Sequence, residues 1–428
     1  MSSIREVRQR LQSLFDAIQR QSDVLVELRN QHGAAQSELN SLRDPNEPVE
    51  LQRQQDVLVE LESQHRVTQS ELNSLLDPMA RLPVELSSDI LRSISPSPTW
   101  KELSTITCVS RMWRSIALGT IFMWDTIRDD GIQPANFPQV FGLWLERGQS
   151  CSLSLALYRL ATETTPGIFA AFRDHAYRVE KLDLHVGSRL PAALVDYPFV
   201  GLKSLTIDAQ EDCCISLAYI LDILRNSPRL VECNVPHGAF QFTTERRVSH
   251  PALRTLRLGR FNHGNVFDAV LRYLKLPCLE TLGVALADCV YLRKFLSRSR
   301  PPLRSLQLYV ERDETLGECL DLIPGLTHLE ICIWDYGWGG PIPFLALLAE
   351  VPECLPALQH LIVHQRSCEG ILDFLLARRG SLRSLRLELV LHRQEDLPGD
   401  LTDVATTVHE FINEGMDIRI ERAGVNLL

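Results

Sequence analysis

The sequence lacks any hydrophobic run long enough to cross a membrane. A bilayer span needs about 18–20 consecutive apolar residues, and the longest candidate, residues 341–352, is short and interrupted by proline. The N-terminus also lacks the apolar core of about 7–15 residues that marks a secretory signal peptide. These two absences argue against a membrane partner and against secretion.

Recognisable metal and disulfide patterns are also missing. The sequence has eleven cysteines but no C-x-x-C pair, and its twelve histidines include no H-E-x-x-H motif. Such scattered cysteines fit neither a zinc framework nor a small disulfide scaffold. They predict a reducing compartment, cytoplasmic and/or nuclear, in which most of them are small core residues. We therefore expect no metal and no cofactor.

Positive charge is in deficit, with a formal net charge of −10. Binding along a phosphate backbone needs clustered Lys and Arg, so we expect no nucleic-acid partner. No G-x-S-x-G motif or P-loop occurs, and no cysteine has a local context that favours a nucleophile, so we expect no enzyme and no catalytic residue. With 428 residues, 45% of them hydrophobic, the chain is long enough for two or three globular domains.

The first feature that is present is a heptad pattern over residues 1–78. Its apolar residues recur at alternating steps of three and four, which predicts a helical, coiled-coil region. The region is internally duplicated, because residues 21–45 return as residues 54–78 with 18 of 25 positions identical. Prolines between the copies predict two helices, about 4–43 and 50–76. The seam of the first comprises Ile4, Val7, Leu11, Leu14, Ile18, Leu25, Leu28, Ala35, Leu39 and Leu42.

The partner of each of these helices is left open by the sequence. Either the two helices fold back on each other as a hairpin, or residues 4–76 pair with another chain and cause self-association. Gln21 and His32 fall on the seam and weaken it. The 33-residue shift is also the ankyrin period, but the copies lack the T-P-L-H turn and a break between two short helices, so we set that interpretation aside.

Beyond residue 150 a second repeat appears, with the pattern L-x-x-L-x-L. The pattern occurs nine times at irregular intervals, and several copies are followed by an amphipathic helical pattern that stops at Pro or Gly. The copies begin at Val179, Leu202, Leu230, Leu253, Leu279, Leu303, Leu326, Leu358 and Leu382.

This alternation of a short strand with a helix resembles leucine-rich repeats. The resemblance implies an α/β solenoid with parallel strands on a concave face. We predict an irregular leucine-rich-repeat horseshoe over residues 175–428, preceded by a linker and N-terminal cap over residues 129–174. The segments 152–157 and 417–421 are predicted as the first and last strands. The expected fold class is thus α plus α/β solenoid.

Residues between the in-pointing leucines are predicted to face solvent on the concave side. Their mixed charge favours protein recognition over phosphate binding. His360 and His364 would be a metal-ligand pair on a helix, but on a strand they lie ~13 Å apart, too far for one ion. The candidate substrate-binding residues are Asp183, Arg257, Tyr309, His328, Glu330 and Arg386.

Residues 81–128 carry the pattern that points to a function. Leu82-Pro83 and Leu86 open the segment, and Trp113 and Trp124 stand near its end. In order and spacing the segment resembles the F-box, and the order of regions along the chain resembles fungal F-box proteins with variable repeat domains. The resemblance implies a three-helix module. Pro83 fits a helix start, where its missing N–H needs no partner.

A module of this size cannot bury all of these apolar side chains within itself, so some must face a partner. The resemblance implies that this partner is a Skp-type adaptor, and through it a cullin scaffold. The residues expected to bind the adaptor are Leu82, Pro83, Leu86, Ile90, Leu91, Leu103, Ile106, Val109, Arg111, Trp113 and Trp124.

The sequence therefore predicts a substrate-receptor subunit of an SCF-type E3 ubiquitin ligase, a member of the ubiquitin conjugation pathway. It would dock the adaptor through the F-box and an unknown target protein through the leucine-rich repeats. The alternative is a non-catalytic oligomeric scaffold or recognition protein with a vestigial F-box. The simplest competing interpretation of residues 81–128 is a helical connector whose Leu and Trp side chains form a private core.

Overall fold

The computed structural model divides the chain into two compact units, Met1–Met123 (unit 1) and Trp124–Leu428 (unit 2). The structure describes residues 19–20, 23–37, 48–76, 82–95, 98–128, 137–148, 151–158, 165–186, 194, 197–209, 214–237, 239–241, 247–259, 268–286, 289–311, 316–334, 344–350, 353–365, 368, 370–389, 401–422 and 425–428. Among these residues, no helix is both long enough and apolar enough to cross a bilayer.

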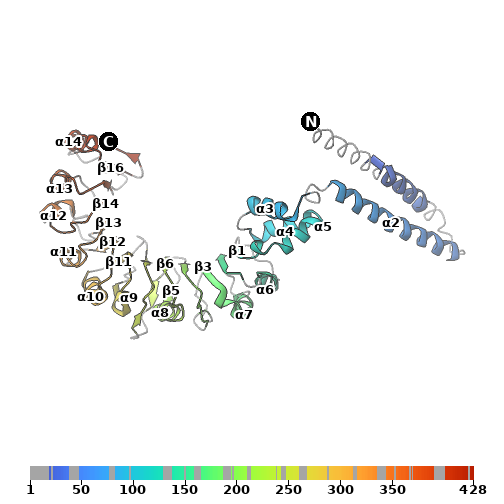
Figure 1. Ribbon diagram of the computed structural model, residues 1–428, viewed down its shortest axis with the longest axis horizontal. Helices are drawn as coiled ribbons and strands as arrows, with labels where there is room; N and C mark the ends of the chain where they lie inside the picture. Colours follow the sequence, from blue (N-terminus) through green and yellow to red (C-terminus); the bar gives the residue numbers. More distant parts are fainter. Residues whose placement is uncertain are drawn as a thin grey trace. The chain divides into compact units, whose positions relative to one another are not determined.

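Unit 1 begins with two helical segments, residues 23–37 and α2 (Pro48–Leu76). Leu25, Leu28 and Ala35 on the first segment are buried, as is Leu58 on α2. His32 Nε2 lies 3.7 Å from Glu62 Oε1 of α2. The two segments therefore pair within one chain as a hairpin (Figure 1).

This pairing is the hairpin, one of the two arrangements that the heptads left open. The predicted helix at 50–76 is confirmed, and the first predicted helix is helical over residues 23–37. The remaining seam positions, Ile4, Val7, Leu11, Leu14, Ile18, Leu39 and Leu42, lie outside the described residues.

The rest of unit 1 contains three helices, α3 (Val84–Ile94), α4 (Trp100–Val109) and α5 (Arg111–Gly119), and the short 3-10 helix η2 (Ile121–Met123). A capping box starts α4, because Thr99 and Glu102 each accept a hydrogen bond from the other's backbone N–H. The Oγ of Ser110 caps α5 by accepting from the Trp113 N–H at 3.1 Å. The three helices predicted for this segment are thus present.

Unit 2 is built on a sheet of thirteen strands among the described residues, and these strands follow one another in chain order. Every neighbouring pair is parallel except the last, which is antiparallel. The strands are β1 (Thr126–Arg128), β2 (Leu153–Tyr158), β3 (Val179–Val186), β4 (Ser204–Ala209), β6 (Glu232–His237), β9 (Thr255–Leu258), β11 (Thr281–Leu286), β12 (Ser305–Glu311), β13 (His328–Trp334), β14 (His360–Gln365), β15 (Ser384–Leu389), β16 (Asp417–Arg422) and β17 (Val425–Asn426). Two small sheets pair β5 (Cys214–Ser216) with β7 (Ala239–Gln241), and β8 (Val248–Ser249) with β10 (Leu274–Lys275).

Helices of unit 2 lie between the strands in sequence and cover one face of the long sheet (Figure 1). Parallel neighbours require such a crossover, because the chain must return to the same end of the sheet. The helical segments are α6 (Phe137–Arg147), α7 (Thr165–Arg173), η3 (Ala176–Arg178), α8 (Leu217–Asn226), α9 (Asp268–Tyr273), α10 (Val290–Ser299), α11 (Leu316–Leu320), α12 (Phe344–Glu350), α13 (Ile371–Ala377) and α14 (Leu401–Asn413).

The core of unit 2 lies between the helices and the sheet. Leu256, Leu282 and Leu306 stand in register on β9, β11 and β12, and each is at most 1% exposed. Each of the nine predicted repeats contains a strand. The predicted mixed α/β architecture with a long, mostly parallel sheet is confirmed. The residues between the leucines lie on the opposite, helix-free face, which corresponds to the predicted concave face.

The predicted limits of the sheet were wrong. The strand β1 precedes segment 152–157 and pairs in parallel with β2, and β17 follows segment 417–421 as an antiparallel partner of β16. The strand β1 also lies inside the segment predicted as the F-box, and Trp124 belongs to unit 2. A strand as short as β1 carries too little alternation to be recognised in the sequence, so only pairing identifies it.

Candidate functional site

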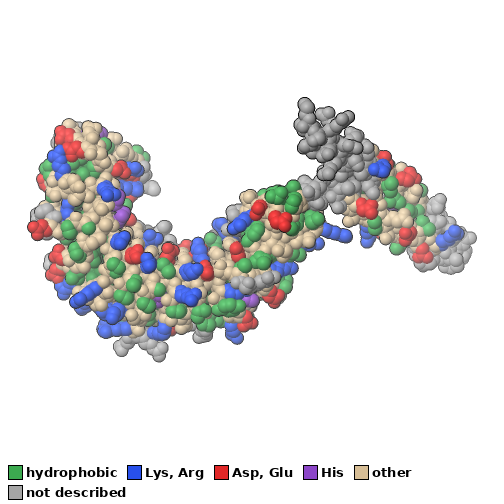
Figure 2. Space-filling model, in the orientation of Figure 1, with side chains coloured by type: hydrophobic (Ala, Val, Ile, Leu, Met, Phe, Trp, Pro, Cys, Tyr) green, Lys and Arg blue, Asp and Glu red, His purple; other side chains and the backbone are tan. Residues whose placement is uncertain are grey.

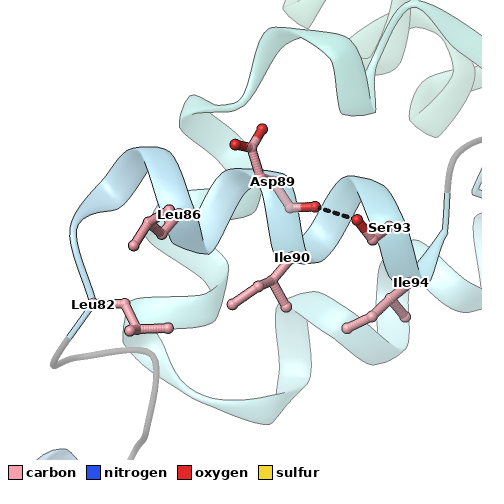
Figure 3. A pocket seen from close by; sticks show the side chains of 6 residues that line it. All are labelled: Leu82, Leu86, Asp89, Ile90, Ser93 and Ile94. Atoms are coloured by element: carbon pink, nitrogen blue, oxygen red, sulfur yellow. Dashed lines mark hydrogen bonds between the residues drawn. The ribbon is translucent and has the colours of Figure 1, made fainter.

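A shallow apolar groove lies on the exposed side of α3. Leu82, Leu86, Ile90 and Ile94 recur every four residues, so their side chains follow one side of the helix (Figure 3). These side chains are 38%, 51%, 38% and 62% exposed, respectively. The groove has a volume of about 400 Å³ and is completed by Asp89 and Ser93.

Another side of α3 packs against the rest of unit 1. Ser87 and Leu91 are fully buried, and Ser88 Oγ lies 3.0 Å from Thr120 Oγ1 in a hydrogen bond that ties α3 to the end of α5. The helix therefore carries apolar side chains on two sides. The side with Leu91 is buried in the core of unit 1, and the side that forms the groove is exposed. Figure 2 shows hydrophobic and acidic side chains together at the surface where α3 lies.

The predicted adaptor-binding residues differ in how far they are buried. Leu91, Leu103, Ile106 and Trp124 are buried core residues that present little surface to a partner, contrary to their predicted role as adaptor contacts. Trp124 packs edge-on against Trp144 of α6 at 6.0 Å between ring centroids, inside unit 2. Trp113 is half-buried. The exposed members are Leu82, Pro83, Leu86, Ile90, Val109 and Arg111.

Ile94 was missed as a candidate, although it is the most exposed of the four apolar side chains in the groove. The signal that finds it is its distance of four residues from Ile90, which continues the row that begins at Leu82. Ser93 Oγ donates a hydrogen bond to the Asp89 carbonyl at 2.8 Å, so the side chain of Ser93 turns back toward its own helix. The groove is thus apolar along its length, with the Asp89 carboxylate at its side (Figure 3).

A chain of polar contacts crosses strands β12 to β15 on the helix-free face. Gln307 Nε2 donates to Tyr309 Oη at 2.9 Å, and Tyr309 Oη donates to Glu330 Oε1 at 2.6 Å. His364 then lies between two carboxylates, with Nε2 3.4 Å from Glu330 and Nδ1 3.2 Å from Glu388. Two predicted substrate-binding residues, Tyr309 and Glu330, are therefore in direct contact.

The pKa values of the two partners in the Tyr309–Glu330 hydrogen bond are shifted in opposite directions. For Tyr309, burial raises the pKa, and the neighbouring Glu330 carboxylate raises it further. For Glu330, burial alone would raise the pKa, but hydrogen bonds from His364, Tyr309 and Gln307 outweigh burial and hold the pKa below its ordinary value. The network therefore consists of an ionised Glu330 and a neutral Tyr309 near neutral pH.

The other predicted substrate-binding residues are spread along the sheet and do not join this network. His328 stacks on His360 with 4.3 Å between ring centroids, and its pKa is lowered by burial and by His360. Asp183 forms an ion pair with Lys181 at 3.0 Å on β3. Arg386 Nη2 donates to Glu421 at 2.8 Å. Arg257 lies on β9, with two strands between it and Glu330.

No group of three or more His, Cys, Asp or Glu side chains suited to holding a metal ion occurs among the described residues. The imidazole of His364 lies within 3.4 Å of Glu330 and 3.2 Å of Glu388, and these contacts are ion pairs when the imidazole is protonated.

Comparison with known proteins identifies no family for this chain. No protein-family profile matches it, and no curated protein matches it. A solved structure described as the crystal structure of a TLR13–ssRNA13 complex is similar over 55% of this chain, with 16% sequence identity and a TM-score of 0.33. The match covers 38% of the TLR13 chain.

Proposed function

We propose that this protein is the substrate-receptor subunit of an SCF-type E3 ubiquitin ligase. The α3 groove would bind a Skp-type adaptor, and through it a cullin scaffold, while the helix-free face of unit 2 would bind the target protein. The observation that carries the proposal is the apolar row Leu82, Leu86, Ile90 and Ile94, exposed on a three-helix segment with the F-box order of residues.

The physical support comes from the cost of leaving this row in water. Fully burying a Leu or Ile side chain is worth about 1.5–3 kcal/mol, so four partly exposed side chains in one row favour an apolar partner surface. A polar rim around an apolar centre is the usual anatomy of an interface, and Asp89 and Ser93 border the apolar row on α3.

We further propose that unit 2 is a leucine-rich-repeat horseshoe. Its strands lie in chain order, its in-register leucines are buried, and its helices lie on one side of the sheet. Such a sheet exposes one face of side chains that differ from strand to strand, which suits recognition of a protein surface. The receptor would act by proximity, holding the target while the transfer machinery on the cullin modifies it.

Adaptor binding tests the proposal directly. We expect the wild-type chain to bind a recombinant Skp-type adaptor with sub-micromolar affinity in isothermal titration calorimetry. The double variant Leu86→Asp, Ile90→Asp places two charges in the groove and removes two anchors, so we expect affinity to fall more than about 100-fold. Both positions are exposed, so the variant should retain the wild-type circular dichroism spectrum.

The matched control is Leu322→Asp, a change at a similarly exposed leucine of unit 2. We expect this variant to bind the adaptor as the wild type does. If the wild-type chain binds no Skp-type adaptor, the proposal fails and a scaffold with a vestigial F-box takes its place. Equal loss in both variants would show that the groove is not the binding surface.

A further inference from the structure

One row of residues on the helix-free face of unit 2 combines polar groups with a glycine. In register on β4, β6, β9 and β11 stand Thr206, Asn234, Arg257 and Gly283. Neighbouring strands are about 4.8 Å apart, so Asn234 is the immediate neighbour of Arg257, and Thr206 is next along the row. Thr206 and Asn234 are half-exposed, and Arg257 is exposed.

Arg257 contrasts with several cations of this face that lie beside a counter-charge. It forms no ion pair with any residue that the structure describes, although acidic side chains neutralise other cations on the same face. The neutralised cations are Lys181 with Asp183, Arg386 with Glu421, and Arg419 with Asp417. Within the described part of the chain, Arg257 therefore offers a guanidinium without a counter-charge near the middle of the sheet.

The absence of a side chain at Gly283 leaves room for the side chain of Arg257. A Cβ atom at Gly283 would lie 3.2 Å from Arg257 Cγ and 3.2 Å from Gln307 Oε1, tighter than ordinary van der Waals contact. The aliphatic stem of Arg257 thus lies against the bare backbone of β11. On the far side of Gly283, the hydrogen bond to Tyr309 fixes Gln307. The stem is confined, while the charged end remains accessible to solvent.

We propose that Arg257, together with Asn234 and Thr206 on the two preceding strands of the sheet, binds an anionic side chain of the target protein, either a carboxylate or a phosphorylated hydroxyl group. This inference rests on the proposed role of the helix-free face as the target surface. A guanidinium matches both anions because it donates two parallel N–H bonds to two oxygens. An amide and a hydroxyl in the same row can donate to the remaining oxygens.

Binding of peptide libraries to the full chain tests this inference. We would immobilise degenerate peptides with a fixed central Glu, phosphoserine, Gln or Lys and measure binding of wild type, Arg257→Gln and Arg386→Gln. We expect wild type to bind the Glu or the phosphoserine library about tenfold better than the Gln library, the size of one charge-assisted bidentate contact. The stronger of the two identifies the anion as carboxylate or phosphate.

Arg257→Gln should abolish this preference, and Arg386→Gln, which removes a cation already paired with Glu421, should keep it. A wild-type chain without preference for either anion would overturn the inference, as would an Arg257→Gln variant that retains the preference. Adaptor affinity separates this result from the proposed function. Arg257→Gln should bind the adaptor normally, so a lost anion preference with normal adaptor binding concerns the target surface alone.

Discussion

Glu330 lies at the junction of three side chains on the helix-free face of the sheet. Tyr309, His364 and Gln307 hold its pKa below the ordinary value of 4.5, against the effect of burial. Because the folded-state pKa is the lower one, the ionised carboxylate stabilises the native state at pH values above the unfolded pKa. That contribution is lost as the pH falls through the folded-state pKa.

We therefore expect Glu330→Gln to destabilise unit 2 at pH 7 by about 1–3 kcal/mol, because hydrogen bonds to a charged group are lost. The difference from wild type should shrink as the pH falls below the ordinary value of 4.5, because the unfolded chain takes up the proton first and the folded carboxyl follows at its lowered pKa. Urea unfolding followed by circular dichroism at several pH values measures both quantities.

The control for this prediction is Glu280→Gln, which removes a carboxylate from the exposed ion pair with Arg254. An exposed pair contributes little, so we expect a small effect at every pH. If Glu330→Gln lowers the free energy of unfolding as much at pH 3 as at pH 7, the loss of stability comes from packing and not from charge.

Among individual residues, the sequence pattern singled out the segment 81–128 but did not distinguish its buried side chains from its exposed ones. Ile90 and Leu91 are neighbours with the same apolar character, yet Ile90 is 38% exposed and Leu91 is fully buried. Which of the two faces outward depends on how α3 packs against α5, a tertiary contact that no local pattern encodes. The polar network around Glu330 was equally hidden, because its members come from the four strands β12 to β15, which are far apart in the sequence.

Among the secondary-structure elements, three buried or partly buried arginines connect successive strand–helix units of unit 2. Each stands at the end of a helical segment of unit 2 and donates to backbone carbonyl groups of the preceding repeat. Free carbonyl groups at the ends of segments need donors, and a guanidinium supplies several at once. The contacts are Arg178 to Leu145 and Cys151, Arg298 to Leu271 and Leu274, and Arg378 to Leu355 and Cys354.

Adjacent arginines provide a test of this role. Arg378 is 4% exposed and bonds to two carbonyl groups, whereas Arg379 is exposed and pairs with Glu414 at the surface. We expect Arg378→Ala to lower the free energy of unfolding by about 2–4 kcal/mol, because two buried carbonyl groups lose a charged donor. Arg379→Ala should change stability little, since surface pairs contribute weakly. Urea unfolding of both variants gives the comparison, and similar losses would contradict it.

The elements show where sequence periodicity is informative. The nine strands of the repeats were predicted because each repeat buries leucines at fixed positions, and that burial leaves a period in the sequence. The strands β1 and β17 were not predicted, because they are very short and are held by backbone pairing to β2 and β16. The linking arginines left no signal either, since arginine in a polar stretch is typical of a solvated surface.

For the molecule as a whole, the two copies of the duplicated N-terminal segment pair with each other. A duplicated amphipathic helix can pair with its own copy, because both copies carry the same apolar positions. Leu25 and Leu58 occupy equivalent positions of the two copies, and both are buried. The described seam positions of the two helices are therefore buried within one chain.

This arrangement predicts that the protein is a monomer, whether or not the segment 1–78 is present. Sedimentation velocity over a range of micromolar concentrations should give the monomer mass for the full chain and for the chain without residues 1–78. The double variant Leu25→Asp, Leu58→Asp puts two charges in the seam, so we expect it to lose helical circular dichroism without a change in mass. A full chain that sediments as a dimer, and becomes a monomer on deletion of residues 1–78, would instead establish pairing between chains. The truncated chain should bind the adaptor as tightly as the full chain does, because the α3 groove begins at Leu82.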